Sequence, residues 1–368
     1  MAQQAERTLQ EALAAFDFGG SVTDAVRYGE GHINDTFLVC GGAERFILQR
    51  VSSAAFKEPD KLMENIVNVT DYLSREIQRQ GGDPRRETLT VVRTRQGENS
   101  FTDSEGGVWR VFPFVESTIC YQAAETPQLF AASGRAFGRF QRLLRDYPAH
   151  TLHETIPHFH DTEDRLRKFN AAVAADPLGR AADCRADIDF VLAREADCSA
   201  ALSAQREGVL PLRVTHNDTK LNNVLMDAET GEALCVIDLD TVMPGLSIND
   251  FGDSIRFGAN HNAEDEPDLS KVNFDLDLFS VYTAAFLEEA GGALTQAEIR
   301  YLPWGAKLMT LECGMRFLTD HLEGDGYFHI SRPGQNLDRA RTQFKLVADM
   351  EAQWGQMNAI VAKYIKAD

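Results

Sequence analysis

The stretch THNDTKLNNVLMD, residues 215–227, places a histidine, a carboxylate, a lysine and an amide within eight residues, directly before an apolar run. A second apolar run, LCVID, follows the turn-forming residues DAETGE and ends at Asp238. Two short strands joined by such a turn are expected to pair as a hairpin, which would bring Asn223 near Asp238. The polar residues of the first stretch are His216, Asp218, Lys220 and Asn223.

These residue types supply the parts that phosphoryl transfer requires. An amide oxygen and a carboxylate are hard oxygen ligands suited to Mg²⁺, so Asn223 and Asp238 are candidate metal ligands. Asp218 remains available to orient and deprotonate a hydroxyl group, and Lys220 can reach a phosphate oxygen. Because phosphoryl transfer depends on positioning and charge neutralisation, the stretch predicts a catalytic loop of the kinase type.

The neighbouring acid, Asp240, leaves two alternatives open. It can touch the metal, or it can serve only to hold the loop. The run Asp238-Leu239-Asp240 also fits the DxD metal motif of glycosyltransferases, but that interpretation leaves the histidine, lysine and asparagine of the first stretch unexplained.

Charge and composition exclude several classes of partner. The chain has 368 residues and a formal net charge of −19, and such a surface repels nucleic acid and anionic lipid. No apolar stretch approaches the roughly 20 residues of a membrane span. The cysteines are scattered without a CxxC pair and the first residues lack the apolar core of a signal peptide, so a reducing cytoplasm is the expected location. No feature of the sequence fixes an oligomeric state.

Strand-like and helical patterns divide the chain near residue 116. Before it, β-branched and aromatic runs predict strands, with one helical pattern between Lys57 and Arg79. After about Thr126 the pattern is mainly helical. We therefore predict an α+β protein with a small β-rich nucleotide-binding lobe, 1–116, and a larger helical catalytic and acceptor-binding lobe, 117–368. The segments expected as strands include 21–31, 34–40, 44–51, 88–95 and 106–116, and those expected as helices include 129–147, 161–175, 187–205, 302–322 and 337–365, with helices resuming after the opening stretch at about residue 269.

The segment HNDTKLNN matches the catalytic-loop pattern HRDxKxxN of protein kinases, and Asp238 stands where those enzymes carry their metal-binding aspartate. Further matching segments are GHINDTFLV, FILQRV, LMENI, TIPHFHDT and DTVMPGLSINDFGDSIRFGAN. With them, most of the chain resembles the phosphotransferase family of aminoglycoside and choline kinases. Within that family it is most similar to bacterial N-acetylhexosamine 1-kinases.

This resemblance implies a bilobal protein-kinase-like fold, ATP, Mg²⁺ and a small sugar acceptor. It also implies roles: Asp218 as catalytic base, Asn223 and Asp238 as metal ligands, and His216 as a brace of the loop. The sequence departs from the family at Asn217, where small-molecule kinases often have glycine. Rival interpretations are a kinase for an amino alcohol or aminoglycoside, and a nucleotide-binding pseudokinase.

Candidate nucleotide-binding residues lie in three segments of the first lobe. Backbone amides of residues 29–33 are expected over the phosphates, with Asn34 where a third glycine would stand. Arg50 is the obvious cation for the phosphates, with Glu64 as its ion-pair partner, unless strand alternation turns Gln49 inward instead. Backbone groups near Pro113–Glu116 are expected to meet adenine. The full set is Gly29, Gly31, His32, Ile33, Asn34, Arg50, Glu64, Phe114 and Glu116.

The segment LECGMRFLTDHLEGDGYF, residues 311–328, predicts the acceptor site. Arg316 and Asp320 lie four residues apart on one helix face and can pair, and Tyr327 follows the glycines that end the helix. The segment is similar to the sugar-binding region of N-acetylhexosamine kinases, so Arg316, Asp320 and Tyr327 are predicted to bind the acceptor beside Asp218. The expected acceptor is the anomeric hydroxyl of N-acetylglucosamine or N-acetylgalactosamine.

Two other groups of residues have predicted roles. Four histidines, His150, His153, His158 and His160, lie in one loop. They are expected to shape the rim of the acceptor cleft or to pack locally. A zinc site is the alternative, but no cysteine accompanies them. Asp250 and Asp253, in DFGDSIR, are expected to cap a helix and to hold the catalytic loop by hydrogen bonds.

Overall fold

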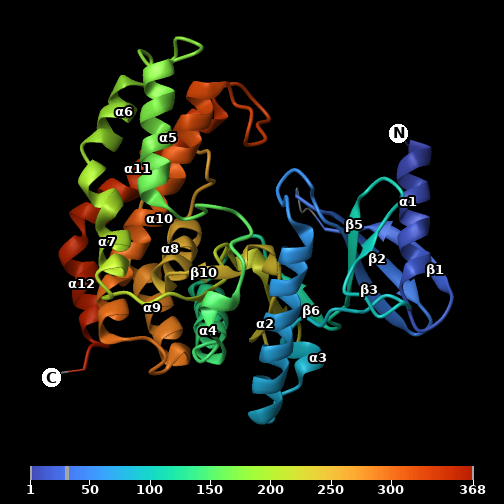
Figure 1. The fold of residues 1–368 in the computed structure, drawn as a ribbon. Coiled ribbons are helices and arrows are strands. Elements are labelled where there is room, and N and C mark those ends of the chain that lie inside the picture. Colours follow the sequence, from blue (N-terminus) through green and yellow to red (C-terminus); the bar gives the residue numbers. More distant parts are fainter. Residues whose placement is uncertain (1, 30–32, 367–368) are drawn as a thin grey trace. The chain divides into compact units, whose positions relative to one another are not determined.

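The computed structural model describes residues 2–29 and 33–366 of the chain, and Figure 1 traces them. Their contacts divide the chain into two compact units. Unit 1 comprises Met1–Ile119, His150–Pro157 and Leu225–Met243, and unit 2 comprises Cys120–Ala149, His158–Val224 and Pro244–Asp368. The predicted lobes 1–116 and 117–368 were assigned by function, to nucleotide binding and to catalysis with acceptor binding, and that assignment stays a prediction. By contacts, unit 1 also takes in two later segments.

Unit 1 is built on an antiparallel sheet with the strand order β1-β2-β3-β5-β4. Helix α1, Ala2–Ala15, packs on this sheet, because Leu9 and Ala12 join Val39 and Leu48 in one apolar core. The strands are β1 Val22–Arg27, β2 Asp35–Gly41, β3 Glu44–Arg50, β4 Phe101–Thr102 and β5 Val108–Pro113.

The rest of unit 1 contains two helices and a second sheet. Helix α2, Pro59–Arg79, begins with a proline at its first turn and buries the predicted apolar stripe; α3 is Pro84–Glu87. The second sheet lies mostly in unit 1 and has the order β6-β8-β9, so the predicted hairpin after the catalytic loop is confirmed. Its strands are β6 Thr118–Cys120, β8 Val224–Asp227 and β9 Ala233–Val236, and a short 3₁₀ turn follows at Leu239–Thr241.

The strand predicted at 88–95 is wrong. Among the described residues this segment makes only isolated bridges, Val92 with Val111 and Thr94 with Phe16. The reason is competition for one strand edge: β4 already pairs with Val108 and Trp109 of β5, which leaves a single bridging position to Val92.

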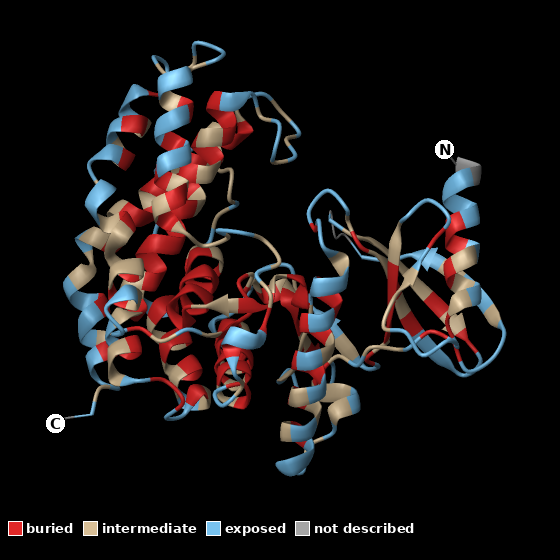
Figure 2. Cartoon of the chain, in the orientation of Figure 1, coloured by how far each residue is buried: buried red, intermediate tan, exposed pale blue. Residues whose placement is uncertain are grey.

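Unit 2 is mainly helical and surrounds the long helix α10, which contacts α5, α8, α11 and α12. Figure 2 shows α8 buried along almost its whole length. The helices are α4 Pro127–Leu143, α5 Thr162–Ala175, α6 Arg185–Leu192, α7 Ala200–Arg206, α8 Ser247–Gly258, α9 Leu276–Ala290, α10 Gln296–Glu323, α11 Gln335–Ala352 and α12 Trp354–Ala362. Strands β7 Arg213–Thr215 and β10 Met243–Gly245 pair with each other, and 3₁₀ turns occupy Glu195–Ser199 and Leu221–Asn223. A further 3₁₀ turn, Ala149–Thr151, lies mostly in unit 1.

Three predicted helices differ in extent. Residues 187–205 form α6, a 3₁₀ turn and α7, because at the break Arg194 turns to Glu351 and Asp197 turns to Lys307. Residues 269–275 precede α9, which starts where the Asp275 side chain accepts hydrogen bonds from the backbone of residues 277 and 278. The helix predicted at 337–365 is divided into α11 and α12.

Helices α8 and α10 cross at two glycines. A Cβ atom on Gly252 would lie 2.2 Å from the carbonyl oxygen of Gly305, and one on Gly305 would lie 2.1 Å from the carbonyl oxygen of Ile248. No larger residue fits this crossing without moving a helix, so it sets where α8 stands in unit 2. Within residues 2–29 and 33–366, no helix has both the length and the apolar character needed to cross a membrane.

Candidate active site

The catalytic loop of unit 2 runs from the end of β7 to the 3₁₀ turn Leu221–Asn223 and rests on α8. One oxygen of the buried Asp250 carboxylate accepts from the backbone N–H of His216 at 2.9 Å, and the other accepts from that of Asn217 at 2.8 Å. Asp253 accepts from the backbone N–H of Thr219 at 3.0 Å. Asp250 and Asp253 therefore hold the loop, as expected. The capping role predicted for them is wrong, because Leu246 occupies the N-cap position of α8.

Asn217 explains the departure from the family pattern. Its φ angle is +66°, in the left-handed region. Glycine enters that region without steric cost, and asparagine is among the few other residues that tolerate it. The loop geometry is therefore one that either residue can adopt.

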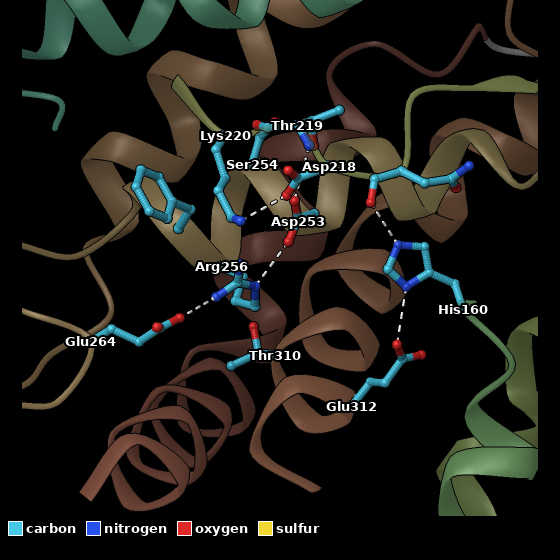
Figure 3. A network of polar contacts seen from close by, with 12 residues as sticks. His160, Asp218, Thr219, Lys220, Asp253, Ser254, Arg256, Glu264, Thr310 and Glu312 are labelled. Atoms are coloured by element: carbon cyan, nitrogen blue, oxygen red, sulfur yellow. Dashed lines mark hydrogen bonds and ion pairs between the residues drawn. The ribbon is translucent and has the colours of Figure 1, made fainter. Parts of the chain in front are cut away.

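Asp218 stands at the centre of the loop with a cation beside it. Lys220 Nζ lies 2.8 Å from Asp218 Oδ1, and Asn223 Nδ2 donates to the backbone oxygen of Asp218 at 2.8 Å and to its carboxylate at 3.2 Å. The backbone N–H of Asp218 donates to His216 Nδ1 at 3.3 Å. Figure 3 shows Lys220 directed at the Asp218 carboxylate.

The charges around Asp218 keep it ionised. Burial works to raise the pKa of Asp218, but Lys220, with His216 and Arg256, outweighs it, so the pKa lies below its ordinary value. Burial likewise works to lower the pKa of Lys220, but Asp218 and Asp253 outweigh it and the pKa is raised. The pair is thus a carboxylate and an ammonium near neutral pH.

Arg256 is a site residue that the sequence analysis missed. Its buried guanidinium lies 2.9 Å from Asp253 and 2.9 Å from Glu264 (Figure 3). The arginine therefore fixes the carboxylate that holds Thr219. The signal was present in DFGDSIR, where the aspartate and arginine stand three residues apart and share a helix face.

In unit 1, the second acid of the motif is engaged in a buried ion pair. Asp240 Oδ1 lies 2.5 Å from Arg110 Nη1, and Asn34 Nδ2 donates to Asp240 Oδ2 at 2.7 Å. Gln49 Oε1 accepts from two nitrogens of Arg110, at 3.0 and 2.8 Å. Asp238 follows β9 with a φ of +58°, in the left-handed region. Asp240 is thus held by Arg110 and Asn34 within unit 1. The residue predicted to bind the metal ion is Asp238, not Asp240.

Gln49 and Arg50 of β3 make separate contacts, and which of them faces the phosphates stays a prediction. Gln49 lies on the face that carries Arg110, whereas Arg50 lies on the other face, 3.5 Å from Asp103. The buried cation on the Gln49 face is therefore Arg110. Sequence reasoning missed it, although an arginine inside the apolar run VWRVFPFV is itself unusual.

The ion pair predicted between Arg50 and Glu64 is wrong. Arg50 contacts Asp103, and Glu64 hydrogen bonds to His153 Nε2 at 2.8 Å. Physically, Arg50 lies against the Asp103 turn because the next strand pair, β4 and β5, brings that carboxylate to the end of β3.

The other predicted nucleotide-binding residues lie at the ends of strands or in the glycine segment. The guanidinium of Arg45 lies over the ring of Phe114, with its central carbon 4.1 Å from the ring centroid. Glu116 forms an ion pair with the same arginine. Gly29 has a φ of +77°, and Ile33 is 60% exposed. Gly31 and His32 lie outside the described residues.

Arg316, a predicted acceptor-binding residue of unit 2, is surrounded by aromatic rings. Its guanidinium lies 5.8 Å from the ring centroid of Phe159, 5.9 Å from that of Tyr327 and 5.3 Å from that of Phe328. Tyr327 is 74% exposed. A second arginine, Arg165, has its pKa lowered by burial and by the charge of Arg316, so this region carries two guanidinium groups.

The ion pair predicted between Arg316 and Asp320 is wrong. The buried Asp320 carboxylate accepts from the backbone N–H groups of Tyr327 and Phe328 at 2.8 and 2.9 Å, and from Asn336 Nδ2 at 2.8 Å. Both oxygens of the carboxylate are thus engaged by donors other than Arg316. Asp320 therefore positions the aromatic loop that faces Arg316.

The four histidines of residues 150–160 do not share one site. His158 and His160 lie in unit 2, bonded to Asp161 and Glu312 respectively, whereas His153 lies in unit 1 and bonds to Glu64. In the part of the chain that the structure describes, no three histidine, cysteine or acidic side chains are arranged to hold a metal ion. A Mg²⁺ site needs fewer protein ligands, because the ion keeps several waters and takes phosphate oxygens. Asn223 and Asp238, an amide and a carboxylate, fit that chemistry.

The comparison with protein families gives one match. The model described as "Phosphotransferase enzyme family" matches residues 24–283, which include the catalytic loop and the acids that follow it.

Solved structures share the fold over nearly the whole chain. An aminoglycoside phosphotransferase from Alicyclobacillus acidocaldarius is 14% identical, with 96% of each chain covered and a TM-score of 0.62. A choline/ethanolamine kinase family protein from Mesorhizobium loti is 19% identical, with 99% of this chain and 100% of that chain covered and a TM-score of 0.57. An amicoumacin kinase in complex with AMP-PNP and Ca²⁺ is 14% identical, with coverages of 100% and 98% and a TM-score of 0.54. The predicted α+β fold of protein-kinase-like type is confirmed.

Proposed function

The chain belongs to the phosphotransferase enzyme family, and from that premise we propose that it transfers the γ-phosphoryl group of ATP to the anomeric hydroxyl of an N-acetylhexosamine. The product is the sugar 1-phosphate. The observation that carries the proposal is the pair formed by Asp218 and Lys220 on a loop whose backbone is held by Asp250 and Asp253. A carboxylate to receive a hydroxyl proton and an ammonium to face a phosphate oxygen are the groups that phosphoryl transfer uses.

The state of Asp218 favours an acidic hydroxyl as the acceptor. Although burial works to raise the pKa of Asp218, Lys220 lowers it below the ordinary value, and a carboxylate of low pKa is a weak base. It serves best when it orients a hydroxyl that loses its proton easily. The anomeric hydroxyl is the most acidic hydroxyl of a sugar, so it matches this base better than a simple alcohol does.

The groups of this chain have separate roles in the proposed reaction. Asp218 accepts the proton of the hydroxyl, Lys220 neutralises charge on the transferring phosphoryl group, and Asp250 and Asp253 keep both at a fixed place by holding the loop. Mg²⁺, held by Asn223 and Asp238, would supply charge neutralisation at the phosphate oxygens. In unit 1, Arg110 and Asn34 hold Asp240, two residues after Asp238, and Gln49 accepts from Arg110.

The acceptor is proposed to bind at the aromatic loop of unit 2. Guanidinium donors suit hydroxyl and acetamido oxygens, and the rings of Phe159, Tyr327 and Phe328 offer apolar faces for the C–H groups of a sugar. A kinase for an amino alcohol or aminoglycoside is the second candidate, since proteins described as a choline/ethanolamine kinase and an aminoglycoside phosphotransferase share the fold. The two arginines in this region repel an ammonium group, which is why the sugar is preferred.

A substrate panel tests the proposal. The protein is mixed with ATP and Mg²⁺, and ADP release is followed with N-acetylglucosamine, N-acetylgalactosamine, ethanolamine and an aminoglycoside. The expected result is ADP release with the hexosamines and a phosphorus NMR signal coupled to the anomeric proton of the product. Release only with the amines would transfer the assignment to the second candidate, and nucleotide binding without release for any acceptor would indicate a pseudokinase.

Asp218→Asn is the matched control for that panel. Because it keeps the size and most hydrogen bonds of the side chain, it is expected to bind nucleotide normally while turnover falls by roughly 10²-fold or more, the usual scale for a positioned base. Turnover at the level of the unchanged protein under saturating substrates would show that another group is the base.

A further inference from the structure

His160 of unit 2 links the catalytic loop to helix α10. Its Nε2 lies 3.0 Å from the backbone oxygen of Asn217, and its Nδ1 lies 3.0 Å from Oε1 of Glu312 on α10 (Figure 3). The side chains of His160 and Glu312 are 11% and 2% exposed. A carbonyl and a carboxylate can only accept, so a ring that bonds to both must donate from both nitrogens, which an imidazolium does and a neutral imidazole does not.

The surrounding charges favour that imidazolium. Burial works to lower the pKa of His160, but Glu312, the Asn217 carbonyl and Asp253 of α8 outweigh it, and the pKa is raised. The second oxygen of Glu312 has no hydrogen-bond partner among the described residues. The cation that acts on Glu312 from α5 is Arg165. Glu312 therefore depends on His160 for its one direct partner.

The same turn of α10 carries the predicted acceptor residue. Glu312 and Arg316 are separated by four residues and so lie one above the other on the helix. Phe159, whose ring lies under Arg316, also packs its ring 4.6 Å from that of His160. Of these two adjacent residues, His160 contacts the catalytic loop and Phe159 contacts Arg316.

We propose that His160 is a positioning residue: as an imidazolium clamped by Glu312, it fixes the Asn217–Asp218 backbone relative to the Arg316 face of α10. This role rests on the proposed function in one respect, namely that Arg316 binds the acceptor. Loss of the clamp removes no reacting group, but it lets Asp218 shift with respect to the acceptor. The rate of turnover should therefore fall while the affinity for nucleotide is kept.

The clamp predicts a pH dependence with a definite sign. The charged form of His160 is present below its pKa, which is raised above the ordinary value of about 6.5. Turnover is therefore expected to be maintained at pH values below that pKa and to fall as the pH rises through it. Glu312→Gln removes the charge that raises the pKa, so the fall moves to lower pH, and in His160→Gln it disappears.

Kinetics and NMR of the full-length protein test the clamp together. His160→Gln, which can donate to only one of the two partners, is expected to lower kcat by about 10- to 100-fold, the scale for a misplacement of catalytic groups, with the ATP KM little changed. Nitrogen chemical shifts of His160 near neutral pH, assigned by their loss in His160→Gln, should place both ring nitrogens in the protonated range. His261→Gln is the control, because that exposed histidine also bonds to an aspartate, Asp275, but contacts no part of the catalytic loop.

The outcomes separate the clamp from the substrate assignment. The nitrogen shifts need no acceptor, and kcat is measured with whichever acceptor the panel identifies. A neutral ring near pH 7, or a charged ring with kcat unchanged in His160→Gln, overturns the proposal. If His160→Gln does not fold, Glu312→Gln decides: an alkaline limb at the same pH as in the unchanged protein contradicts the clamp.

Discussion

At the scale of single residues, the catalytic loop depends on one backbone angle that side-chain chemistry alone does not reveal. Asn217 adopts a φ of +66° between the buried His216 and Asp218, the proposed catalytic base. Its backbone N–H donates to Asp250 and its carbonyl accepts from His160. The resemblance to small-molecule kinases leads one to expect glycine at this position, and the angle explains why asparagine can stand there: both residues enter the left-handed region.

The first prediction concerns this residue. Asn217→Gly is expected to fold and turn over nearly normally, because glycine takes the angle without strain. Asn217→Val should lose about 1–3 kcal/mol of unfolding free energy, the usual cost of forcing such an angle, and lower kcat as well. Urea unfolding and steady-state kinetics measure both effects. Equal stability of the glycine and valine variants would show that the angle is not a constraint.

The second prediction separates the two acids of the motif. Asp240→Ala leaves the buried Arg110 without its carboxylate, and breaking a buried ion pair by removing one partner costs about 3–5 kcal/mol. Asp238→Ala is instead expected to abolish productive binding of Mg²⁺ and nucleotide. Thermal unfolding and Mg²⁺ titrations of activity distinguish them. An unaltered Mg²⁺ requirement in Asp238→Ala contradicts its assignment as a ligand.

At the scale of helices and strands, local patterns predicted which elements form, and tertiary competition decided where they end. The stripe of residues 57–79 became α2, and the hairpin after the catalytic loop formed. The strand at 88–95 failed because β4 occupies the edge of β5, which no local pattern encodes. The pairs Arg50–Glu64 and Arg316–Asp320 failed for a similar reason. Neither the order of a strand and the next helix nor spacing along one helix shows that Asp103, or the amides of Tyr327 and Phe328, bind more directly.

A prediction for the helices follows from the crossing of α8 and α10. Gly305→Ala puts a methyl group 2.1 Å from the carbonyl oxygen of Ile248, and overpacking of this kind costs about 1–3 kcal/mol of unfolding free energy. Because α8 carries Asp250 and Asp253, kcat should fall too. Gly326→Ala is the control, since a Cβ there meets no atom within 4 Å. Equal melting temperatures of the two variants would contradict the argument.

A second element-scale prediction concerns the aromatic loop after α10. Arg316→Ala and Tyr327→Ala are expected to raise the acceptor KM by roughly tenfold or more, because losing a polar contact to substrate costs about 1–3 kcal/mol. The ATP KM should change little. Initial rates with each substrate varied in turn measure this. Unchanged acceptor KM values in both variants would place the acceptor pocket elsewhere.

At the scale of the whole molecule, composition predicted the fold class and the charge but not the buried polar contacts. The order of strand-rich and helical segments indicated an α+β protein, and the resemblance to the phosphotransferase family implied the kinase-like type. The catalytic loop was recognisable because its residues are close in sequence. Arg110 and the contact between His160 and Glu312 were not, because their partners lie up to 152 residues away.

The net charge of −19 leads to a prediction for the molecule as a whole. A surface of that sign slows the approach of anionic nucleotide, and salt screens it. Raising the ionic strength from about 10 mM to about 150 mM, which shortens the Debye length to about 8 Å, should raise kcat/KM for ATP. The same ratio for an uncharged acceptor should stay constant and serves as the control. A fall in both ratios would point to a specific effect of salt on the loop.

The two compact units are each made of separate pieces of chain. The chain passes from one unit to the other five times, at 119/120, 149/150, 157/158, 224/225 and 243/244. A gene fragment that ends near residue 119 would therefore encode unit 1 without β8, β9 or the segment 150–157. Recombination at a single junction cannot transplant either unit whole. Diversification of this protein by shuffling of modules is thereby restricted, and substitution within loops such as 327–328 is the route that its architecture leaves open.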